Sequence, residues 1–443
     1  MWKNWAGDQA CTPAAVVRPS AVEAVQEAVR NAAGQGSGIR VVGAGHSFGD
    51  NVLTSGTLMS LDSLTGLLGV DATAGTVRVA AGTRLHELNQ LLDARGLALA
   101  NLGDIDSQSV AGAISTGTHG TGRTLGNLAT FVEDVELVTA DGDVVQASEA
   151  GAGVLEAARL AVGSLGVVTA YTLKILPAYT LRCEQEPAPL ADVLERLDSE
   201  VDANRHFEFF SFPHSDTVIA KRTNRVENVP VGRAAGQDTV TGPAAVAGKV
   251  KAYLEEELLE NTALDLVCRL GRARRSLIPR LNRLATDLVS PTVRTGRSHE
   301  VLVTRRSVRF TETEWALPRE AGAEALKEMR RVVTARGLDV NFPFEVRFVA
   351  ADEQSFLSPA YGRDSCYIAA HMYRGMPWQE FFGAVQDVAL AYGGRPHWGK
   401  RHTLSADRLA GLYPRWEEFQ DARRRLDPHG LFSNDHTRRI FGA

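Results

Sequence analysis

The amino-acid sequence predicts a two-domain protein that mixes helices and strands. The chain has 443 residues, which is more than one hydrophobic core usually organises. Short apolar segments spaced by glycines recur up to residue 168, whereas longer and more charged elements take over near Pro177. We therefore predict one domain over residues 1–177 and a second over residues 178–443.

Composition excludes several classes of protein. Apolar residues make up 44% and charged residues 23% of the chain, as in ordinary soluble proteins. The net charge of −5 gives no general attraction to nucleic acid or to an anionic membrane. The four cysteines form no C-x-x-C pair, the N-terminus lacks the apolar core of a signal peptide, and no stretch approaches the ~18 apolar residues of a membrane span. We expect a soluble cytoplasmic protein with no nucleic-acid partner, no membrane span and no thiol-bound metal.

The first domain opens with a predicted helix. Ser20 followed by Glu23 is typical of a capping box, and apolar residues then recur at helical spacing as far as Gly34. Later patterns predict strands over 58–61 and 76–80, a helix over 85–95, a hairpin over 132–146 with its turn at Asp141-Gly142, and a strand from 167 to 176.

A glycine-rich stretch over residues 40–49 is the first candidate site. Two valines lead into a loop that contains Gly43, Gly45, His46 and Gly49. Glycines allow positive φ and bring backbone N–H groups close together, which makes an anion site, usually for phosphate. A Rossmann fingerprint is not predicted, because Phe48 occupies the third glycine position. An ordinary turn with a buried or solvent-facing histidine is the alternative.

Two further stretches of small residues predict ligand contacts. Residues 109–122 consist mainly of glycine, alanine, serine and threonine, so the backbone can pass close to a flat or extended ligand. A flexible linker is the less favoured interpretation, because Val110 and Ile114 are apolar and proline is absent. Residues 161–168 form a third glycine-spaced apolar stretch.

In the second half, strands and helices alternate. The predicted strands cover residues 206–212, 342–349 and 366–373, and the predicted helices cover 250–259, 319–336, 378–392 and 406–426. A surface loop is predicted over 232–242, and the segment 427–432 is expected to end the fold.

Two groups of residues in this half could do chemistry. Glu345 and Arg347 stand two apart on a predicted strand, so they share one face and could orient hydroxyl groups or stabilise negative charge. An ion pair on a solvated face is the alternative. His397 and Lys400 flank Trp398 and Gly399, and a lysine beside aromatic residues is partly desolvated and suited to polarising a substrate oxygen. A cation–π surface turn is the alternative there. No nucleophilic serine motif, metal motif or Walker A motif is present.

These stretches together are similar to a known family. Residues 40–49, 109–122 and 163–168 resemble the flavin-binding domain of the vanillyl-alcohol oxidase (VAO/PCMH) type flavoproteins. Residues 344–348, 371–374 and 397–400 resemble its aldonolactone oxidase branch, which includes L-gulono-1,4-lactone and D-arabinono-1,4-lactone oxidases and is close to alditol oxidases. The resemblance implies an α+β fold: an N-terminal FAD-binding domain, and a substrate domain with an antiparallel sheet flanked by helices. The C-terminal residues from about 404 onwards would pack back on the FAD domain.

The resemblance also implies FAD, joined covalently through His46 to the flavin 8α-methyl group. The residues that it implies for cofactor binding are Val42, Gly43, Ala44, Gly45, His46, Ser47, Gly103, Ser109, Val110, Gly112, Ala113, Ser115, Thr116, Gly117, His119, Gly120, Gly166 and Val168.

For the chemistry, the resemblance implies hydride transfer from a carbinol carbon to flavin N5 and reoxidation by O₂ to hydrogen peroxide. Arg347 would stabilise the reduced flavin or hold the reacting oxygen, while Glu345 and Lys400 would bind substrate hydroxyls, with His371 and His397 as further candidates.

Three positions bear on the substrate and the electron acceptor. Gly103 matches a gate beside the flavin, where family members with dehydrogenase behaviour carry alanine, so it favours an oxidase. Asp104 replaces the serine that often follows this gate, at an expected substrate contact. Tyr373 matches lactone oxidases better than alditol oxidases, so a sugar lactone is favoured over a polyol; alditol oxidase and lactone dehydrogenase activities are the alternatives.

Overall fold

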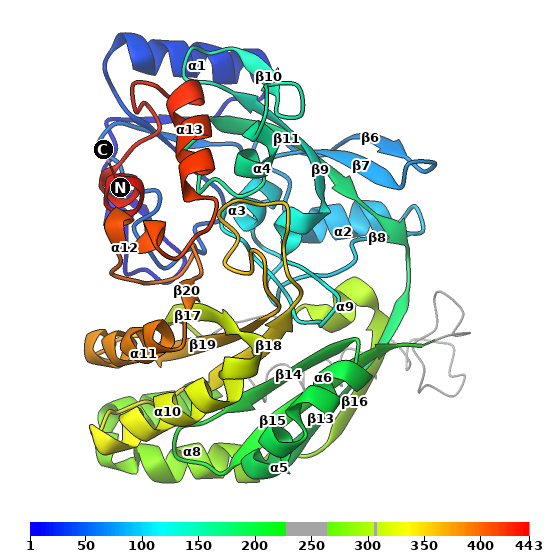
Figure 1. The fold of residues 1–443 in the computed structure, drawn as a ribbon, viewed down its shortest axis with the longest axis vertical. Coiled ribbons are helices and arrows are strands. Elements are labelled where there is room, and N and C mark those ends of the chain that lie inside the picture. Colours follow the sequence, from blue (N-terminus) through cyan, green and yellow to red (C-terminus); the bar gives the residue numbers. More distant parts are fainter. Residues whose placement is uncertain (227–263, 305–307, 443) are drawn as a thin grey trace, which may run out of the picture.

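The computed structural model describes residues 1–226, 264–304 and 308–442 (Figure 1). The surface loop predicted over 232–242 and the helix predicted over 250–259 lie outside these residues. In Figure 1 the first domain occupies the upper half and the large sheet of the second domain the lower half. Within the described ranges, no helix combines the length and apolar character needed to cross a membrane.

The first domain contains a small parallel sheet with one covering helix. Its strands are β3 (Ala15–Val17), β5 (Thr57–Ser60) and β4 (Ile39–Val42), in that order across the sheet. Helix α1 (Val22–Gly34) buries Val25 and Val29 against this sheet. The predicted cap is wrong: the N-cap residue is Ala21, whose extended backbone starts the helix one residue after Ser20, and no side chain caps it.

A five-stranded antiparallel sheet forms the rest of the first domain. Its strand order is β10 (Val144–Gln146), β9 (Val132–Val138), β11 (Val167–Lys174), β7 (Thr76–Ala80) and β6 (Leu67–Asp71). The predicted hairpin is confirmed, with β9 and β10 antiparallel and Gly142 at φ 80° in the turn. Helix α2 (Leu85–Asp93) is confirmed as well. The remaining elements are β1 (Trp2–Lys3), β2 (Ala10–Cys11), β8 (Leu97–Ala98), β12 (Leu176–Pro177), η1 (Leu128–Phe131) and α4 (Val154–Ala158).

The small-residue stretch over 109–122 is partly helical, not a loop throughout. Helix α3 (Val110–Ser115) occupies its first half, and the Ser109 side chain caps it by accepting from the N–H of Gly112. Because a helix turns its side chains in different directions, Val110 and Ala113 are buried in the hydrophobic core.

The second domain is built on one eight-stranded sheet in which every neighbouring pair is antiparallel. The strand order is β16 (Thr292–Arg297), β13 (Thr180–Pro189), β15 (Thr217–Arg225), β14 (His206–Ser211), β18 (Phe344–Val349), β19 (Ser365–Tyr373), β17 (Phe310–Pro318) and β20 (Arg395–Pro396). The predicted α+β fold class with an antiparallel second sheet is thus confirmed, although the sequence did not predict β13, β15, β16 or β17.

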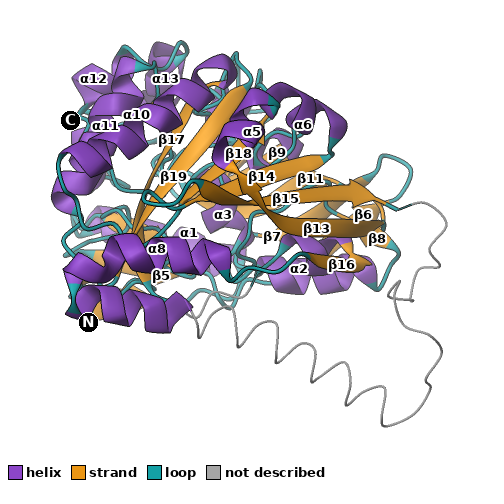
Figure 2. Ribbon diagram, turned by 90° about the horizontal axis from the view of Figure 1, so that it is seen from below, coloured by secondary structure: helices purple, strands orange, loops and turns teal. Residues whose placement is uncertain are grey.

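Four of the described helices cover one face of this sheet, and the first domain lies against part of the other face. Figure 2 shows α5 (Leu190–Glu195), α6 (Leu197–Ala203), α10 (Gly322–Ala335) and α11 (Gln379–Ala391) together on one side, where they contact β13, β14, β19 and β17. Phe344 of β18 packs on Phe381 of α11 there. This domain also contains helices α8 (Ile278–Asp287) and α9 (Ser298–Leu302), the short helices η2 (Arg275–Leu277) and η3 (Arg319–Ala321), and the helical residues 264–273. Alternation along each strand sends Glu345 and Arg347 to the opposite face, toward the first domain.

The C-terminal residues differ from the predicted single helix over 406–426. They form α12 (Ala406–Ala410), α13 (Trp416–Leu426) and a further helix, α14 (Asp435–Phe441), beyond the predicted end of the fold. The break follows Gly411 and contains Pro414, which cannot sit inside a helix. In Figure 1, α12 and α13 stand beside the first domain. Asn434 fixes this segment there by donating to the backbone oxygens of Asp50, Asn51 and Leu53.

Candidate functional site

A groove of about 1000 Å³ lies in the first domain along the glycine-rich stretch. The loop after β4, the start of α3 and the segment 162–168 line it together. A side chain at position 43 would displace the Ser109 side chain that caps α3, because a Cβ there would lie 2.2 Å from Ser109 Oγ. The backbone of this loop therefore lies directly against α3, and the groove keeps room for a ligand whose phosphates the loop N–H groups can bind.

The buried guanidinium of Arg40 holds the groove together. It donates to the backbone oxygens of Asn51, Val162, Gly163 and Phe432, which come from three separate parts of the chain. Burial lowers the pKa of Arg40 to about 10, so the group remains charged at neutral pH.

Twelve of the predicted cofactor residues line this groove. They are Val42, Gly43, Ala44, Gly45, His46, Ser47, Ser109, Gly112, Ser115, Thr116, Gly166 and Val168. Gly103 and His119 line a neighbouring pocket instead, and Val110, Ala113, Gly117 and Gly120 line neither cavity.

The second cavity, of about 690 Å³, lies between the first domain and the face of the large sheet that carries Glu345 and Arg347. It holds all five predicted catalytic residues, Glu345, Arg347, Lys400, His371 and His397, and the predicted substrate residue Asp104. The two cavities share His46, Ser47, Gln108 and Thr116, so they meet at His46.

His46 is oriented from both sides at this junction. Its ring stacks on Trp5 with 5.2 Å between centroids, and its Nε2 lies 2.8 Å from Ser107 Oγ. Its Nδ1 is buried without a hydrogen-bond partner among the described residues. Burial lowers the pKa of His46 to about 4, and nearby cations, Lys400 foremost, add to the effect. The imidazole is therefore neutral at physiological pH and can act as a nucleophile.

Arg347 lies inside a cage of carboxylates at one end of the pocket. Its guanidinium contacts Asp104 at 2.5 Å, Glu208 at 2.8 Å and Glu345. Burial would lower the pKa of Arg347, but these three carboxylates outweigh it and raise that pKa well above its usual range. Glu208 also pairs with Lys221 at 2.6 Å. The predicted pairing of Glu345 with Arg347 on one strand face occurs, and both are buried rather than solvated.

Lys400 lies at the other end of the pocket, held by the strand β17. Its Nζ lies 2.6 Å from Glu312 and 3.9 Å from Glu314, and 5.1 Å from the centre of the Phe48 ring. A surface turn is thus the wrong interpretation of this segment. Trp398, expected to pack beside the lysine, instead donates to the Leu357 backbone oxygen in the core.

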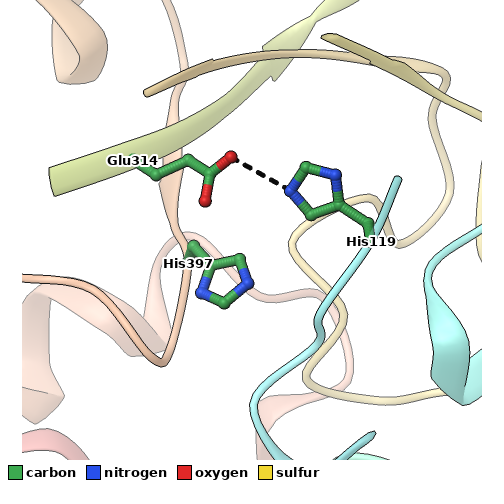
Figure 3. Close-up of side chains that lie close together, drawn as sticks. All are labelled: His119, Glu314 and His397. Carbon is green, nitrogen blue, oxygen red and sulfur yellow. Dashed lines mark hydrogen bonds and ion pairs between the residues drawn. The ribbon is translucent and has the colours of Figure 1, made fainter. Parts of the chain in front are cut away.

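Glu314 also faces two histidines. Figure 3 shows Glu314, His119 and His397 converging from three separate segments, with Glu314 Oε1 3.1 Å from His119 Nε2. All three side chains are buried, and their ligand-type atoms lie within 4.8 Å of one another. Burial lowers the pKa of His397 to about 3, so it is neutral.

His371 lies between the two ends of the pocket. Its Nε2 is 3.7 Å from Glu312 and 3.8 Å from Glu345. Its Nδ1 lies 3.1 Å from the Pro343 backbone oxygen, which can only accept, so Nδ1 carries the hydrogen. In the neutral ring the lone pair is then on Nε2.

Tyr373 does not line the pocket, so the structure does not support the prediction that it contacts the substrate. It shares a strand face with His371, but it lies at the end of β19, where its hydroxyl donates to Asp265 at 2.8 Å and Arg272 covers its ring. Sequence analysis also missed Glu208, Glu312 and Glu314. The alternating Thr-Glu-Thr-Glu of residues 311–314 was an available signal for a strand with two carboxylates on one face.

Comparisons with known proteins agree with this geometry. Residues 171–440 match the family model described as D-arabinono-1,4-lactone oxidase, and residues 13–148 match an FAD binding domain. L-gulono-1,4-lactone dehydrogenase of Mycobacterium tuberculosis is 43% identical, over 100% of this chain and 99% of its own length. L-gulonolactone oxidase of Mus musculus is 34% identical, over 99% of this chain and 98% of its own.

A solved structure shows the same fold. A solvent-stable cholesterol oxidase superposes with a TM-score of 0.80 at 17% identity, covering 99% of this chain and 97% of its own. The chain therefore belongs to the D-arabinono-1,4-lactone oxidase family of FAD-dependent oxidoreductases.

Proposed function

We propose that the protein oxidises a secondary alcohol of an aldono-1,4-lactone, such as L-gulono- or D-arabinono-1,4-lactone, with FAD as cofactor and O₂ as electron acceptor. One observation carries the proposal: the pocket of charged side chains opens onto the groove at His46. The relatives reported above are named for lactone substrates, and this pocket is rich in groups that bind hydroxyls.

The groove fits FAD. Its glycine loop offers backbone N–H groups to the phosphates, and the His46 end leaves a buried nitrogen, Nδ1, that lacks a partner among the described residues. We infer that Nδ1 forms the covalent bond to the flavin, since Nε2 is already held by Ser107. FAD, when bound, takes two electrons from the substrate carbon as a hydride.

The chain's own residues bind the lactone and move its proton. Glu345 accepts hydrogen bonds from substrate hydroxyls, and Lys400 donates to a substrate oxygen from the opposite end of the pocket. When the His371 ring is neutral, its Nε2 takes the proton of the reacting hydroxyl, because Nδ1 donates to the Pro343 backbone oxygen and the lone pair is then on Nε2. The carboxylates of Glu312 and Glu345 stabilise the resulting imidazolium from either side.

Gly103 supports the choice of oxygen as acceptor. It lines the pocket, and a Cβ at this position would lie 3.0 Å from Thr118 Cγ2 and 3.1 Å from the His119 backbone oxygen. Glycine therefore keeps this part of the pocket wall free of a methyl group that would press on these two atoms. A dehydrogenase that passes electrons to another acceptor is the second candidate, favoured by the name of the Mycobacterium tuberculosis relative.

A substrate panel tests the proposal. Purified holoenzyme is mixed without oxygen with L-gulono-1,4-lactone, D-arabinono-1,4-lactone, xylitol and sorbitol, and flavin absorbance is followed. Bleaching by the lactones at lower concentration than by the polyols is expected. Preference for xylitol or sorbitol would assign an alditol oxidase, and no bleaching at all would overturn the enzymatic assignment. Oxygen uptake compared with dye reduction then identifies the acceptor.

A further inference from the structure

The hydrogen-bond partners of His119 determine how many protons the His119–Glu314 pair holds. Its Nδ1 lies 2.8 Å from the backbone oxygen of Gly120, and its Nε2 lies 3.1 Å from Glu314 Oε1. A carbonyl oxygen can only accept, so Nδ1 carries a hydrogen. Nε2 then faces a carboxylate oxygen, and the contact is favourable only when a hydrogen lies between the two atoms. The buried pair therefore holds one proton more than a neutral imidazole and a carboxylate do.

The surroundings place this proton on His119. Lys400 Nζ lies 3.9 Å from Glu314 Oε2, and its positive charge favours the ionised carboxylate. Burial raises the pKa of Glu314, but His119 outweighs it, with help from His397 and Lys400, and that pKa lies well below its usual range. The remaining neighbour is Tyr367, whose ring centroid is 3.9 Å from that of His119 and whose pKa is raised well above its usual range by burial, so it adds no charge.

A metal ion is a poorer explanation of the same cluster. His397 Nδ1 lies 3.0 Å from the N–H of Gly399 and accepts from it. A neutral imidazole that accepts at Nδ1 carries its hydrogen on Nε2, and that nitrogen cannot ligate a metal without losing it. His397 is thus a neutral imidazole with its hydrogen on Nε2.

The pair also acts on Lys400. Glu312 and Glu314 stand two apart on β17, so both carboxylates lie on the face toward the pocket and hold the same ammonium group. Were Glu314 to take up a proton, one of these two charges would be lost and the ammonium would be held by Glu312 alone. The charge of His119 is what keeps the buried Glu314 ionised.

We propose that His119 is a positioning residue: as an imidazolium paired with the Glu314 carboxylate, it fixes Lys400 at the substrate pocket. The inference rests on the proposed function for the role of Lys400, whereas the protonation of the pair stands independently of it.

Joint neutron and X-ray crystallography of the deuterium-exchanged holoenzyme tests the protonation directly. Deuterium is expected on both nitrogens of His119 and on neither oxygen of Glu314. Deuterium on Glu314, or on only one nitrogen of His119, would overturn the proposal. This result does not depend on turnover, so failure of the proposed lactone oxidation leaves it interpretable.

Two single variants and their combination test the effect on Lys400. In Glu314→Gln the amide can donate to a neutral His119, so the fold is retained while both charges disappear. We expect kcat/KM for the lactone to fall roughly 10- to 100-fold in Glu314→Gln and in His119→Gln, because the ammonium is displaced. The double variant should be no worse than either single variant, since the two residues act as one unit.

His206→Gln is the matched control. His206 is also buried, and its Nδ1 lies 2.7 Å from the Thr121 backbone oxygen, but it does not line the pocket. This variant should lose stability and keep its kcat/KM. A kinetic loss in His119→Gln no larger than that of the control, or additive losses in the double variant, would remove His119 from the positioning of Lys400.

Discussion

Asp104 of the first domain and Arg347 of the second form an ion pair of 2.5 Å at the floor of the substrate pocket. Asp104 lies on the loop between β8 and α3, and Arg347 lies on the central strand β18. The pocket is thus closed by a contact between domains. The three carboxylates around Arg347 leave no positive charge there for an anionic ligand, so the pocket favours an uncharged sugar derivative over its acid.

Asp104→Asn should weaken this discrimination. Removing one negative charge leaves Arg347 paired with Glu208 and Glu345, so the site tolerates an anion better. We expect the inhibition constant of L-gulonate, the hydrolysed acid of the lactone, to fall by about 3- to 10-fold. Steady-state inhibition at constant ionic strength measures it. An unchanged constant would mean that Asp104 does not set the charge preference.

Glu208→Ala should destabilise the protein strongly. The substitution leaves Arg347 and Lys221 buried without their shared carboxylate, and breaking such a network costs about 3–5 kcal/mol. Chemical denaturation of the holoenzyme measures the change in free energy of unfolding. Glu186→Ala is the control on the same sheet: Glu186 is half-exposed and pairs with Arg222, so it should cost less than about 1 kcal/mol. Equal losses would contradict the buried network.

Gly103→Ala should slow reoxidation of the flavin by oxygen but not reduction of the flavin by the substrate. The added methyl group would crowd Thr118 Cγ2 and the His119 backbone oxygen and would shift this part of the pocket wall. We expect oxygen-coupled turnover to fall about tenfold, which corresponds to about 1.4 kcal/mol in the barrier, while dye-coupled turnover is retained. A parallel fall in both rates would show that the substitution disturbs the substrate pocket instead.

His46→Ala should release the flavin from the polypeptide. The wild-type protein is expected to keep yellow colour and flavin fluorescence on a denaturing gel, and the variant to lose both to the acid supernatant. Ser107→Ala is an informative companion, because it removes the partner that orients the His46 ring and leaves the nucleophile in place. Flavin that stays with the His46→Ala polypeptide would place the bond elsewhere.

Acidification should destabilise the fold through His206. Burial lowers the pKa of His206 to about 4, and among its charged neighbours Arg205 and Arg225 oppose protonation while Glu208 favours it. The unfolded chain binds a proton below about pH 6.5, so stability falls from there toward pH 4, by about 2 kcal/mol between pH 7 and pH 5. His206→Gln should lose correspondingly less over this interval, measured by denaturant unfolding of both holoenzymes. Equal losses would contradict the prediction.

The sequence predicts which side chains share a strand face wherever charged and apolar residues alternate along the strand. Glu345 and Arg347 alternate with apolar residues, so their shared face follows from the period of two. Strand β17 was not predicted, because four of its first five residues are polar or charged, although all five are buried in the fold. Glu312 and Glu314 were therefore missed, although they hold the predicted Lys400.

The errors at Tyr373 and Trp398 have another cause. Both residues were placed by their neighbours in the chain, but the end of a strand and a tight turn send adjacent side chains in different directions. Tyr373 meets Asp265, and Trp398 enters the core. Which residues share a pocket depends on how the strands pair, and single-sequence patterns do not contain that information.

The contacts of Arg40 determine when the cofactor groove can be completed during synthesis of the chain. Its guanidinium joins the strand before the glycine loop to Gly163 and to Phe432, so two walls of the cofactor groove are fastened to a segment translated almost 400 residues later. While the chain is still on the ribosome, the first domain can form its sheets but lacks this fastening. We therefore expect a protein truncated before Phe432 to hold the groove by fewer contacts and to bind FAD more weakly than the full chain.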